Sequence, residues 1–166
     1  MNLNTSNVNN FDFEKFYQII EENNNFIITT HVNPDGDAIG SAMALYYFVK
    51  SFSKNVRVIN YNKTPKYYAF LDRDNIIEQF NDSHADCIKK AGVIFFVDLN
   101  ELSRVKTMAP FAESSTALKV IIDHHQPNHK FCDIVFSDTN SSSTGEILYK
   151  LISNKYNSKI SKEIAV

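Results

Sequence analysis

Three side chains that could hold a divalent cation lie close together in the segment HVNPDGD, namely His31, Asp35 and Asp37. Pro34 fixes one backbone angle there and Gly36 permits unusual ones, so a short loop can point an imidazole and two carboxylates into one small volume. Crowded carboxylates repel one another unless a cation lies between them. Because the set mixes nitrogen and oxygen, it suits Mn2+ or another divalent first-row metal. The segment therefore predicts a metal site.

A simpler interpretation explains the two acids without a metal. Asp35 would cap the helix that follows, and Asp37 would lie in the first turn of that helix, where the helix dipole favours a negative charge. This interpretation gives His31 no role. We therefore favour the metal site.

Further carboxylates and imidazoles follow two other apolar runs of the sequence. Asp98 ends one of these runs, and the triplet Asp123-His124-His125 ends the other. If two ions shared Asp98, its carboxylate would hold them about 3.5–4 Å apart, which is the spacing of two-metal phosphoester hydrolysis. The alternative for the two histidines is an ordinary surface turn.

The order of the predicted elements indicates how these residues come together. We expect strands at 26–30, 55–61, 93–97, 118–122 and 131–136, and helices at 11–22, 38–52, 64–71, 82–90 and 144–152 and from 158 onward. Strands that alternate with helices predict an α/β fold, a three-layer, doubly wound, mainly parallel sheet with helices on both faces. Ligands of such sheets bind outside the carboxyl ends of the strands, where the acidic and histidine residues fall.

Two details of this prediction concern apolar side chains. The neighbouring aromatic residues Tyr67 and Tyr68 are expected to pack on the core rather than to form a base-stacking platform. The helix from residue 158 is expected to expose Ile160 and Ile164.

Composition restricts the class of protein. The chain has 166 residues, 43% of them hydrophobic, which is enough for one globular domain, and it has no apolar run long enough to cross a membrane. Its net charge of -2 gives no support for broad electrostatic binding to duplex nucleic acid. Residues 1–10 are polar and rich in asparagine, which predicts a disordered leader rather than a signal peptide. The two cysteines form no framework, so a cytoplasmic location is expected.

Several motifs in sequence order resemble the DHH phosphoesterase superfamily, which is named for the triplet Asp123-His124-His125. Within it, the segments HVNPDGDAIGSAMAL, FLDR, VDLNELSR, IDHHQPN and SSSTGEIL are similar to the nanoRNase and pAp phosphatase (NrnA-like oligoribonuclease) branch. The resemblance covers residues 11–166 and implies a catalytic DHH domain. It also implies a Mn2+-dependent enzyme that hydrolyses short oligoribonucleotides and 3'-phosphoadenosine 5'-phosphate (pAp) by two-metal water activation.

The resemblance implies a ligand set for each of two Mn2+ ions, with Mg2+ or Co2+ as substitutes. His31, Asp35 and Asp98 would hold the first ion. Asp37, Asp98 and His124 would hold the second. Asp98 would then bridge the two ions.

Further residues would serve the substrate or support the ligands. His125 would contact the scissile phosphate and assist the leaving group, and Asp123 would orient the histidines. Arg104 lies where the family has a basic residue after the bridging aspartate, although a structural salt bridge is an equal alternative. Residues 142–144 would cap a helix near the site.

The resemblance also indicates what the chain lacks. In the family, a later strand-end aspartate supplies another ligand to the second metal, and a second domain, DHHA1, grips the substrate. Asp138 comes too early to be that ligand by motif, although it could approach the site. We therefore expect a C-terminally truncated catalytic half. Its expected partners are the absent DHHA1 domain, short single-stranded RNA or pAp and, in one arrangement, a second copy of the chain, with no membrane.

Other functions stay open at this point. They are a cyclic dinucleotide phosphodiesterase, a RecJ-like single-strand exonuclease, a manganese pyrophosphatase and an inactive fragment that binds metal or a partner chain. The cyclic dinucleotide phosphodiesterases usually carry membrane and sensory segments, and the RecJ-like exonucleases have a larger core. The manganese pyrophosphatases resemble the HVNPDGD loop less well. The absent ligand keeps the inactive fragment open.

Overall fold

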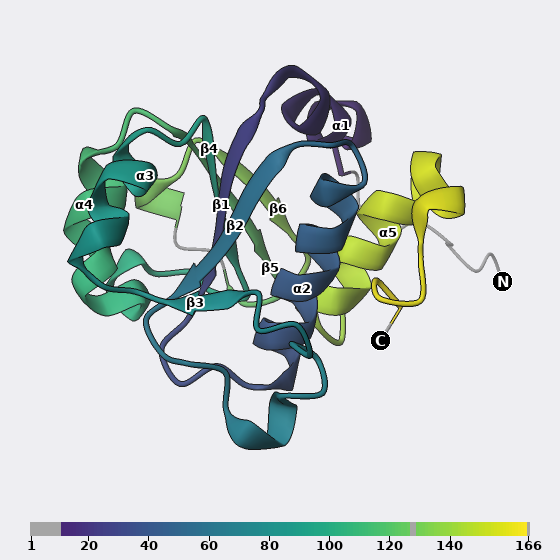
Figure 1. Ribbon diagram of the computed structural model, residues 1–166. Coiled ribbons are helices and arrows are strands. Elements are labelled where there is room, and N and C mark those ends of the chain that lie inside the picture. Colours follow the sequence, from purple (N-terminus) through teal and green to yellow (C-terminus); the bar gives the residue numbers. More distant parts are fainter. Residues whose placement is uncertain (1–10, 127–128, 166) are drawn as a thin grey trace, which may run out of the picture.

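Six parallel strands form one sheet in the computed structural model of the chain, and helices cover both faces of it (Figure 1). The structure describes residues 11–126 and 129–165, so the predicted leader at 1–10 lies outside the described residues. The strands are β1 (Asn25–Thr30), β2 (Asn55–Asn60), β3 (Ile77–Gln79), β4 (Val93–Val97), β5 (Leu118–Asp123) and β6 (Ile134–Ser137). All of their pairings are parallel, so the predicted α/β fold is confirmed.

The helices divide between the two faces. One face carries α1 (Phe13–Glu22), α2 (Gly36–Lys50) and α5 (Thr144–Tyr156), and the other carries α3 (Ala85–Lys89), α4 (Ala109–Ser114) and the 3₁₀ segment η3 (Leu102–Met108). Shorter 3₁₀ turns are η1 (Lys66–Tyr68), η2 (Asp82–His84), η4 (His129–Phe131) and η5 (Asn157–Lys159). No helix in the described part of the chain is both long and apolar enough to cross a membrane.

The central strand β4 shows why the apolar runs are continuous rather than alternating. All five of its residues are buried. Val93, Phe95 and Val97 pack toward α1, α2 and α5, whereas Ile94 and Phe96 pack toward α3 and α4. A strand that is covered on both faces has no polar face, so its sequence has no polar positions.

The strand order changes direction in the middle of the sheet, between β1 and β4. The order is β3-β2-β1-β4-β5-β6, so the chain proceeds from β1 toward one edge and from β4 toward the other. Connections that diverge from neighbouring strands leave a ligand-binding crevice at their carboxyl ends. His31 follows β1 and Asp98 follows β4 at this point.

Three parts of the secondary structure differ from the sequence prediction. β3 was not predicted, because a three-residue edge strand is too short to show a periodic pattern. Helix α4 was not predicted either. The helix predicted from residue 158 is wrong within the described residues, since a 3₁₀ turn and a second short turn take its place. Ile160 and Ile164, expected to be exposed, instead pack partly buried against the core.

Candidate metal centre

Strand register brings the candidate residues into one row at the carboxyl edge of the sheet. Thr30 of β1 pairs with Val97 of β4, and Val97 pairs with Ile122 of β5. The residues that follow these three positions are His31 after β1, Asp98 after β4 and Asp123 at the end of β5, and they lie in the next row. Adjacent parallel strands are about 4.8 Å apart, so residues in one row are neighbours in space.

The loop from β1 to α2 places His31 and Asp35 beside Asp98. The His31 ring is 7% exposed, with Nδ1 2.9 Å from the Val32 carbonyl oxygen and Nε2 3.5 Å from Asp98 Oδ2. If Nδ1 donates to that carbonyl, Nε2 is the nitrogen that can bind a metal. Asp35 caps α2 by accepting a hydrogen bond from the Ala38 amide at 3.0 Å. One carboxylate oxygen is enough for this cap, so capping and metal binding are compatible.

The unusual backbone angle of this loop lies at Asn33 and not at Gly36. Asn33 has a φ of 54°, whereas no glycine among the described residues has a positive φ. The small size of Gly36 matters for a different reason, which is the close approach of Tyr68. A Cβ atom at this position would lie 3.1 Å from Cε1 of Tyr68, because that ring packs against the start of α2.

Asp98 lies at the centre of the site. It is 2% exposed and has a φ of 58°, which places its backbone in the left-handed region that aspartate tolerates better than most residues. Burial raises the pKa of Asp98, but the interactions with His31 and Thr144 outweigh this effect, so the pKa lies below its ordinary value. Asp98 is therefore a carboxylate at neutral pH, as a metal ligand must be.

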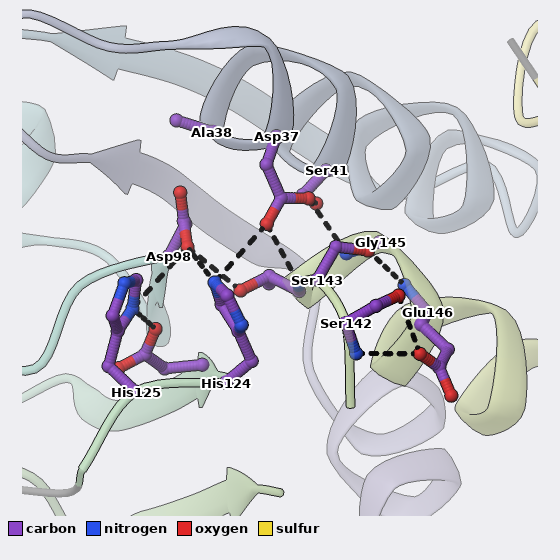
Figure 2. Close-up of polar contacts among 12 residues, drawn as sticks. Asp37, Ala38, Ser41, Asp98, His124, His125, Ser142, Ser143, Gly145 and Glu146 are labelled. Carbon is purple, nitrogen blue, oxygen red and sulfur yellow. Dashed lines mark hydrogen bonds and ion pairs between the residues drawn. The ribbon is translucent and has the colours of Figure 1, made fainter. Parts of the chain in front are cut away.

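Asp37 lies on α2, but its side chain points to the N-terminus of α5. Its carboxylate accepts hydrogen bonds from the backbone amides of Thr144 at 2.8 Å and Gly145 at 3.0 Å, and from the hydroxyl of Ser41 at 3.1 Å (Figure 2). A negative charge at the N-terminus of α5 is favourable because the helix dipole and the unpaired amides both attract it. Asp37 thus ties α2 to α5 beside the metal loop.

The two adjacent histidines have different surroundings. The Nε2 atom of His124 lies 3.7 Å from Asp37 Oδ2 and 3.7 Å from Asp98 Oδ1, so this ring lies between the two carboxylates (Figure 2). The Nδ1 atom of His125 lies 2.8 Å from Asp123 Oδ1. Asp123 is 1% exposed, and its other oxygen has no hydrogen-bond partner among the described residues. The Nε2 atom of His125 has no hydrogen-bond partner among the described residues and could contact a ligand.

Two sets of donors result, and they share one residue. The ligand atoms of His31, Asp35 and Asp98 lie within 4.8 Å of one another, as do those of Asp98, His124 and His125. Two atoms that are each about 2.1 Å from one ion are about 3–4 Å apart, so separations of 3.5 and 3.7 Å suit coordination better than direct hydrogen bonding. The residues therefore fit divalent cations. Within the second set we favour His124 as ligand, because Nδ1 of His125 is engaged by Asp123.

Comparison with known families agrees with this geometry. The family described as "DHH family, N-terminal domain" matches residues 25–166, a range that contains every candidate ligand. This chain belongs to the DHH family. The superfamily resemblance predicted from the motifs is confirmed.

Two curated relatives match the DHH chain. The uncharacterized protein MG371 of Mycoplasma genitalium is 31% identical over 156 residues, which is 92% of this chain and 45% of the relative. The bifunctional oligoribonuclease and PAP phosphatase NrnA of Thermus thermophilus is 29% identical over 125 residues, which is 75% of this chain and 35% of the relative. The chain therefore spans less than half the length of either relative.

Two solved structures share the fold. An exopolyphosphatase-related protein from Bacteroides fragilis superimposes with a TM-score of 0.87 at 36% identity, over 92% of this chain and 46% of that one. The exonuclease RecJ bound to manganese gives a TM-score of 0.50 at 10% identity, over 87% of this chain and 38% of that one. The second likeness shows a common fold only.

Thr144 hydrogen-bonds to two candidate ligands, a role that the sequence did not predict. Its hydroxyl donates to Asp98 Oδ1 at 3.0 Å, and its backbone amide donates to Asp37 Oδ2. The residue is fully buried. Ser143 is the actual cap of α5, because its hydroxyl accepts from the Glu146 amide. A serine and threonine run before a helix indicates a cap, but nothing in it shows that the next hydroxyl reaches a residue 46 positions away.

Removing the Thr144 hydroxyl should weaken metal binding. In Thr144→Val the side chain keeps its shape, but Asp98 loses a hydrogen bond that fixes its orientation. Loss of such a supporting contact typically costs about 10–100-fold in metal affinity. Calorimetric titration with Mn2+ measures this, with Thr144→Ser as the control that keeps the hydroxyl. Equal affinity of Thr144→Val and the parent would show that this hydrogen bond does not support the site.

Arg104 contacts the metal loop through its backbone, whereas Asp138 is bound within its own turn. The backbone carbonyl of Arg104 accepts from the Val32 amide at 2.8 Å. Burial lowers the pKa of His31 and the positive charge of Arg104 lowers it further, but the hydrogen bonds to Asp98 and Val32 outweigh both effects and raise the pKa above its ordinary value. The Arg104 guanidinium makes no ion pair with any described residue, which leaves the structural salt bridge without support. The carboxylate of Asp138 accepts from the Ser141 hydroxyl and the Asn140 amide within its own turn. The structure therefore does not bring Asp138 into either donor set.

The N-terminus of α5 predicts a pH effect on stability. A salt bridge to Lys150 at 2.7 Å and hydrogen bonds from Ser142 lower the pKa of Glu146 from 4.5 to about 2. A carboxyl group with a lowered pKa in the folded state stabilises the fold above pH 4.5, and this contribution is lost as the pH falls from 4.5 to 2.

Glu146→Gln should therefore lower the melting temperature of the metal-free chain at pH 7, and the difference from the parent should shrink toward pH 2. Thermal unfolding by circular dichroism over this range measures it. Glu113→Gln, at an exposed glutamate with no ion pair among the described residues, serves as the control. A difference that stays constant between pH 7 and pH 2 would contradict the prediction.

Proposed function

We propose that this chain is the catalytic half of a Mn2+-dependent phosphoesterase that hydrolyses short oligoribonucleotides and pAp. The observation that carries the proposal is the position of Asp98, a buried carboxylate that belongs to both sets of donors. Two divalent ions held by such a site would supply a water of lowered pKa as nucleophile and would polarise a phosphoryl oxygen.

The first set would hold one ion. For the other ion we take Asp98 and His124 from the second set and add Asp37, whose Oδ2 atom lies 3.7 Å from His124 Nε2, in place of His125. Thr144 and the amides of α5 keep Asp98 and Asp37 in place by the hydrogen bonds described above. The chain thus fixes the two carboxylates before any ligand arrives, which reduces the reorganisation that the reaction requires.

His125 is suited to act on the substrate. Its ring is 46% exposed, whereas that of His124 is 24% exposed. With Nδ1 donating to the Asp123 carboxylate, Nε2 can hold a proton near a phosphate and pass it to the leaving oxygen. The buried Asp123 side chain orients this ring through the hydrogen bond to Nδ1.

The choice of substrate rests on the relatives. NrnA of Thermus thermophilus is described as an oligoribonuclease and PAP phosphatase, and it shares 29% identity with this chain. We propose a DHHA1 domain as a partner that would add contacts to the substrate. The substrate class is therefore inferred from similarity, whereas the chemistry is inferred from the site.

Hydrolysis with and without Mn2+ tests the proposal. The purified chain is incubated with pAp and with a diribonucleotide, in Mn2+ and in excess chelator, and products are separated by chromatography. Mn2+-dependent release of AMP from pAp, and of mononucleotides from the dinucleotide, supports the proposal. No turnover of either substrate in Mn2+ would contradict it for this chain.

A metal-binding half without turnover is the second candidate. The observation that favours it is that Asp138 is engaged within its own turn, so the second donor set has only three members on the described residues. In that case Mn2+ would raise the melting temperature, because it binds only the folded state, while hydrolysis stays at background.

A further inference from the structure

A short loop beside the metal centre carries an unusual group of exposed aromatic side chains. We call residues 64–73 the aromatic loop. Tyr67 is 73% exposed and Phe70 is 54% exposed, and only Tyr149 joins them as a large exposed hydrophobic side chain among the described residues. The sequence prediction that Tyr67 packs on the core is therefore wrong. Keeping aromatic rings in contact with water is energetically unfavourable, so this group of exposed rings indicates a surface that contacts a ligand.

The aromatic loop is held in a defined conformation. Asp72 is 6% exposed, and its carboxylate accepts from the Thr64 hydroxyl at 2.9 Å and from the Ile76 amide at 2.7 Å. The bond from Thr64 joins the two ends of the loop, and the bond from Ile76 ties the loop to the chain that follows it. The exposed rings are thus presented from a closed turn, so little conformational entropy is lost when a ligand packs on them.

Two glycines of α2 let this loop approach the metal site. The ring of Tyr68 packs against Gly36, and Leu71 packs near Gly40, one turn further along α2. Gly36 lies between the candidate ligands Asp35 and Asp37. In Figure 1 the teal turn that carries η1 projects below β3 and the start of α2, at the carboxyl edge of the sheet.

Tyr67 extends this contact outward. Its ring centroid is 4.6 Å from that of Tyr68, with an angle of 70° between the planes. Tyr68 therefore supports Tyr67 from the side of the metal loop and leaves most of Tyr67 in solvent. An exposed, supported ring of this kind is suited to stacking on a planar group.

Positive charge accompanies the rings. Lys63 and Lys66 flank Pro65 at the start of the turn, both are exposed, and neither makes an ion pair with a described residue. The chain as a whole has a net charge of -2. Lysines next to exposed aromatic rings combine attraction for phosphate with a stacking surface, which is the pattern of single-stranded nucleic acid binding.

We infer that Tyr67, supported by Tyr68, stacks on the base of a nucleotide whose phosphate lies at the metal centre. The inference rests on the proposed function, since it places the substrate of that same site. Docking of a protein domain on these rings is the competing explanation, and the experiments below distinguish the two.

A fluorescence experiment tests the contact directly. The chain contains no tryptophan, so Tyr67→Trp introduces a single emitter at the proposed stacking position. In the presence of Mn2+, AMP should quench this emission in a saturable manner, whereas ribose 5-phosphate, which has no base, should not. Tyr149→Trp on α5 is the matched control, because Tyr149 is 60% exposed but lies outside the aromatic loop. Its emission should not respond to either compound.

Kinetics provide the second measurement. Stacking of a base on an aromatic ring contributes about 1–3 kcal/mol, so Tyr67→Ala should raise the KM for pAp by about 5- to 150-fold with little change in kcat. Tyr67→Phe should keep the parent KM, because the stacking surface remains. Tyr149→Ala should also keep it.

The outcomes separate this inference from the proposed function. If the parent hydrolyses pAp but AMP does not quench Tyr67→Trp, the stacking inference is wrong and the function stands. If AMP quenches Tyr67→Trp but the parent shows no Mn2+-dependent hydrolysis, the stacking inference is supported and the function is wrong. Emission of Tyr67→Trp that is already blue-shifted and insensitive to AMP would overturn the inference in favour of a protein contact.

Discussion

Asp98→Asn should abolish stoichiometric binding of both metal ions and reduce hydrolysis to background. Asp98 is the residue that the two donor sets share, and an amide has no charge to neutralise a divalent cation. The substitution is otherwise conservative. Asparagine tolerates the left-handed backbone that Asp98 adopts with a φ of 58°, and its oxygen can still accept from the Thr144 hydroxyl. Loss of metal therefore reports loss of the ligand and not of the fold.

Calorimetric titration with Mn2+ measures the stoichiometry, and circular dichroism verifies the fold. Asp35→Asn is the matched control, because Asp35 belongs to one donor set only and its removal should eliminate one of two sites. If Asp98→Asn also eliminates only one site, Asp98 does not bridge the ions.

The row of site residues at the sheet edge could be predicted from the sequence because local patterns determine it. The apolar runs before His31, Asp98 and Asp123 form neighbouring parallel strands, and their register aligns the residues that follow. Parallel strands that are buried on both faces leave polar side chains only at their ends. The type and position of these residues therefore indicated a site before its geometry was known.

Other features depend on contacts between distant segments, which no local pattern encodes. Thr144 reaches Asp98 and Asp37 across 46 and 107 positions of the sequence. Tyr68 packs against Gly36 at the start of α2, and the ring of Tyr67 packs on that of Tyr68. The short strand β3 exists because it pairs with β2 at the edge of the sheet. Each of these is decided by tertiary packing rather than by propensity.

The two adjacent histidines offer a direct test of the division between metal binding and catalysis. His124→Ala should weaken metal binding, because its Nε2 atom lies between Asp37 and Asp98. His125→Asn should leave metal binding near normal. The asparagine amide can donate to Asp123 from a position close to that of the imidazole Nδ1, so the buried carboxylate keeps its partner and the chain should fold.

Turnover of His125→Asn should nevertheless fall by about 10²–10⁴-fold, because the amide has no nitrogen that can hold and transfer a proton. His125→Ala should fall at least as far and should also lower the melting temperature, since it leaves Asp123 buried at 1% exposure without a donor among the described residues. Steady-state hydrolysis of pAp and Mn2+ titration of all three variants measure both properties. If His125→Asn loses metal as strongly as His124→Ala does, His125 is itself a ligand. The second ion would then be held by Asp98, His124 and His125 rather than by Asp37, Asp98 and His124.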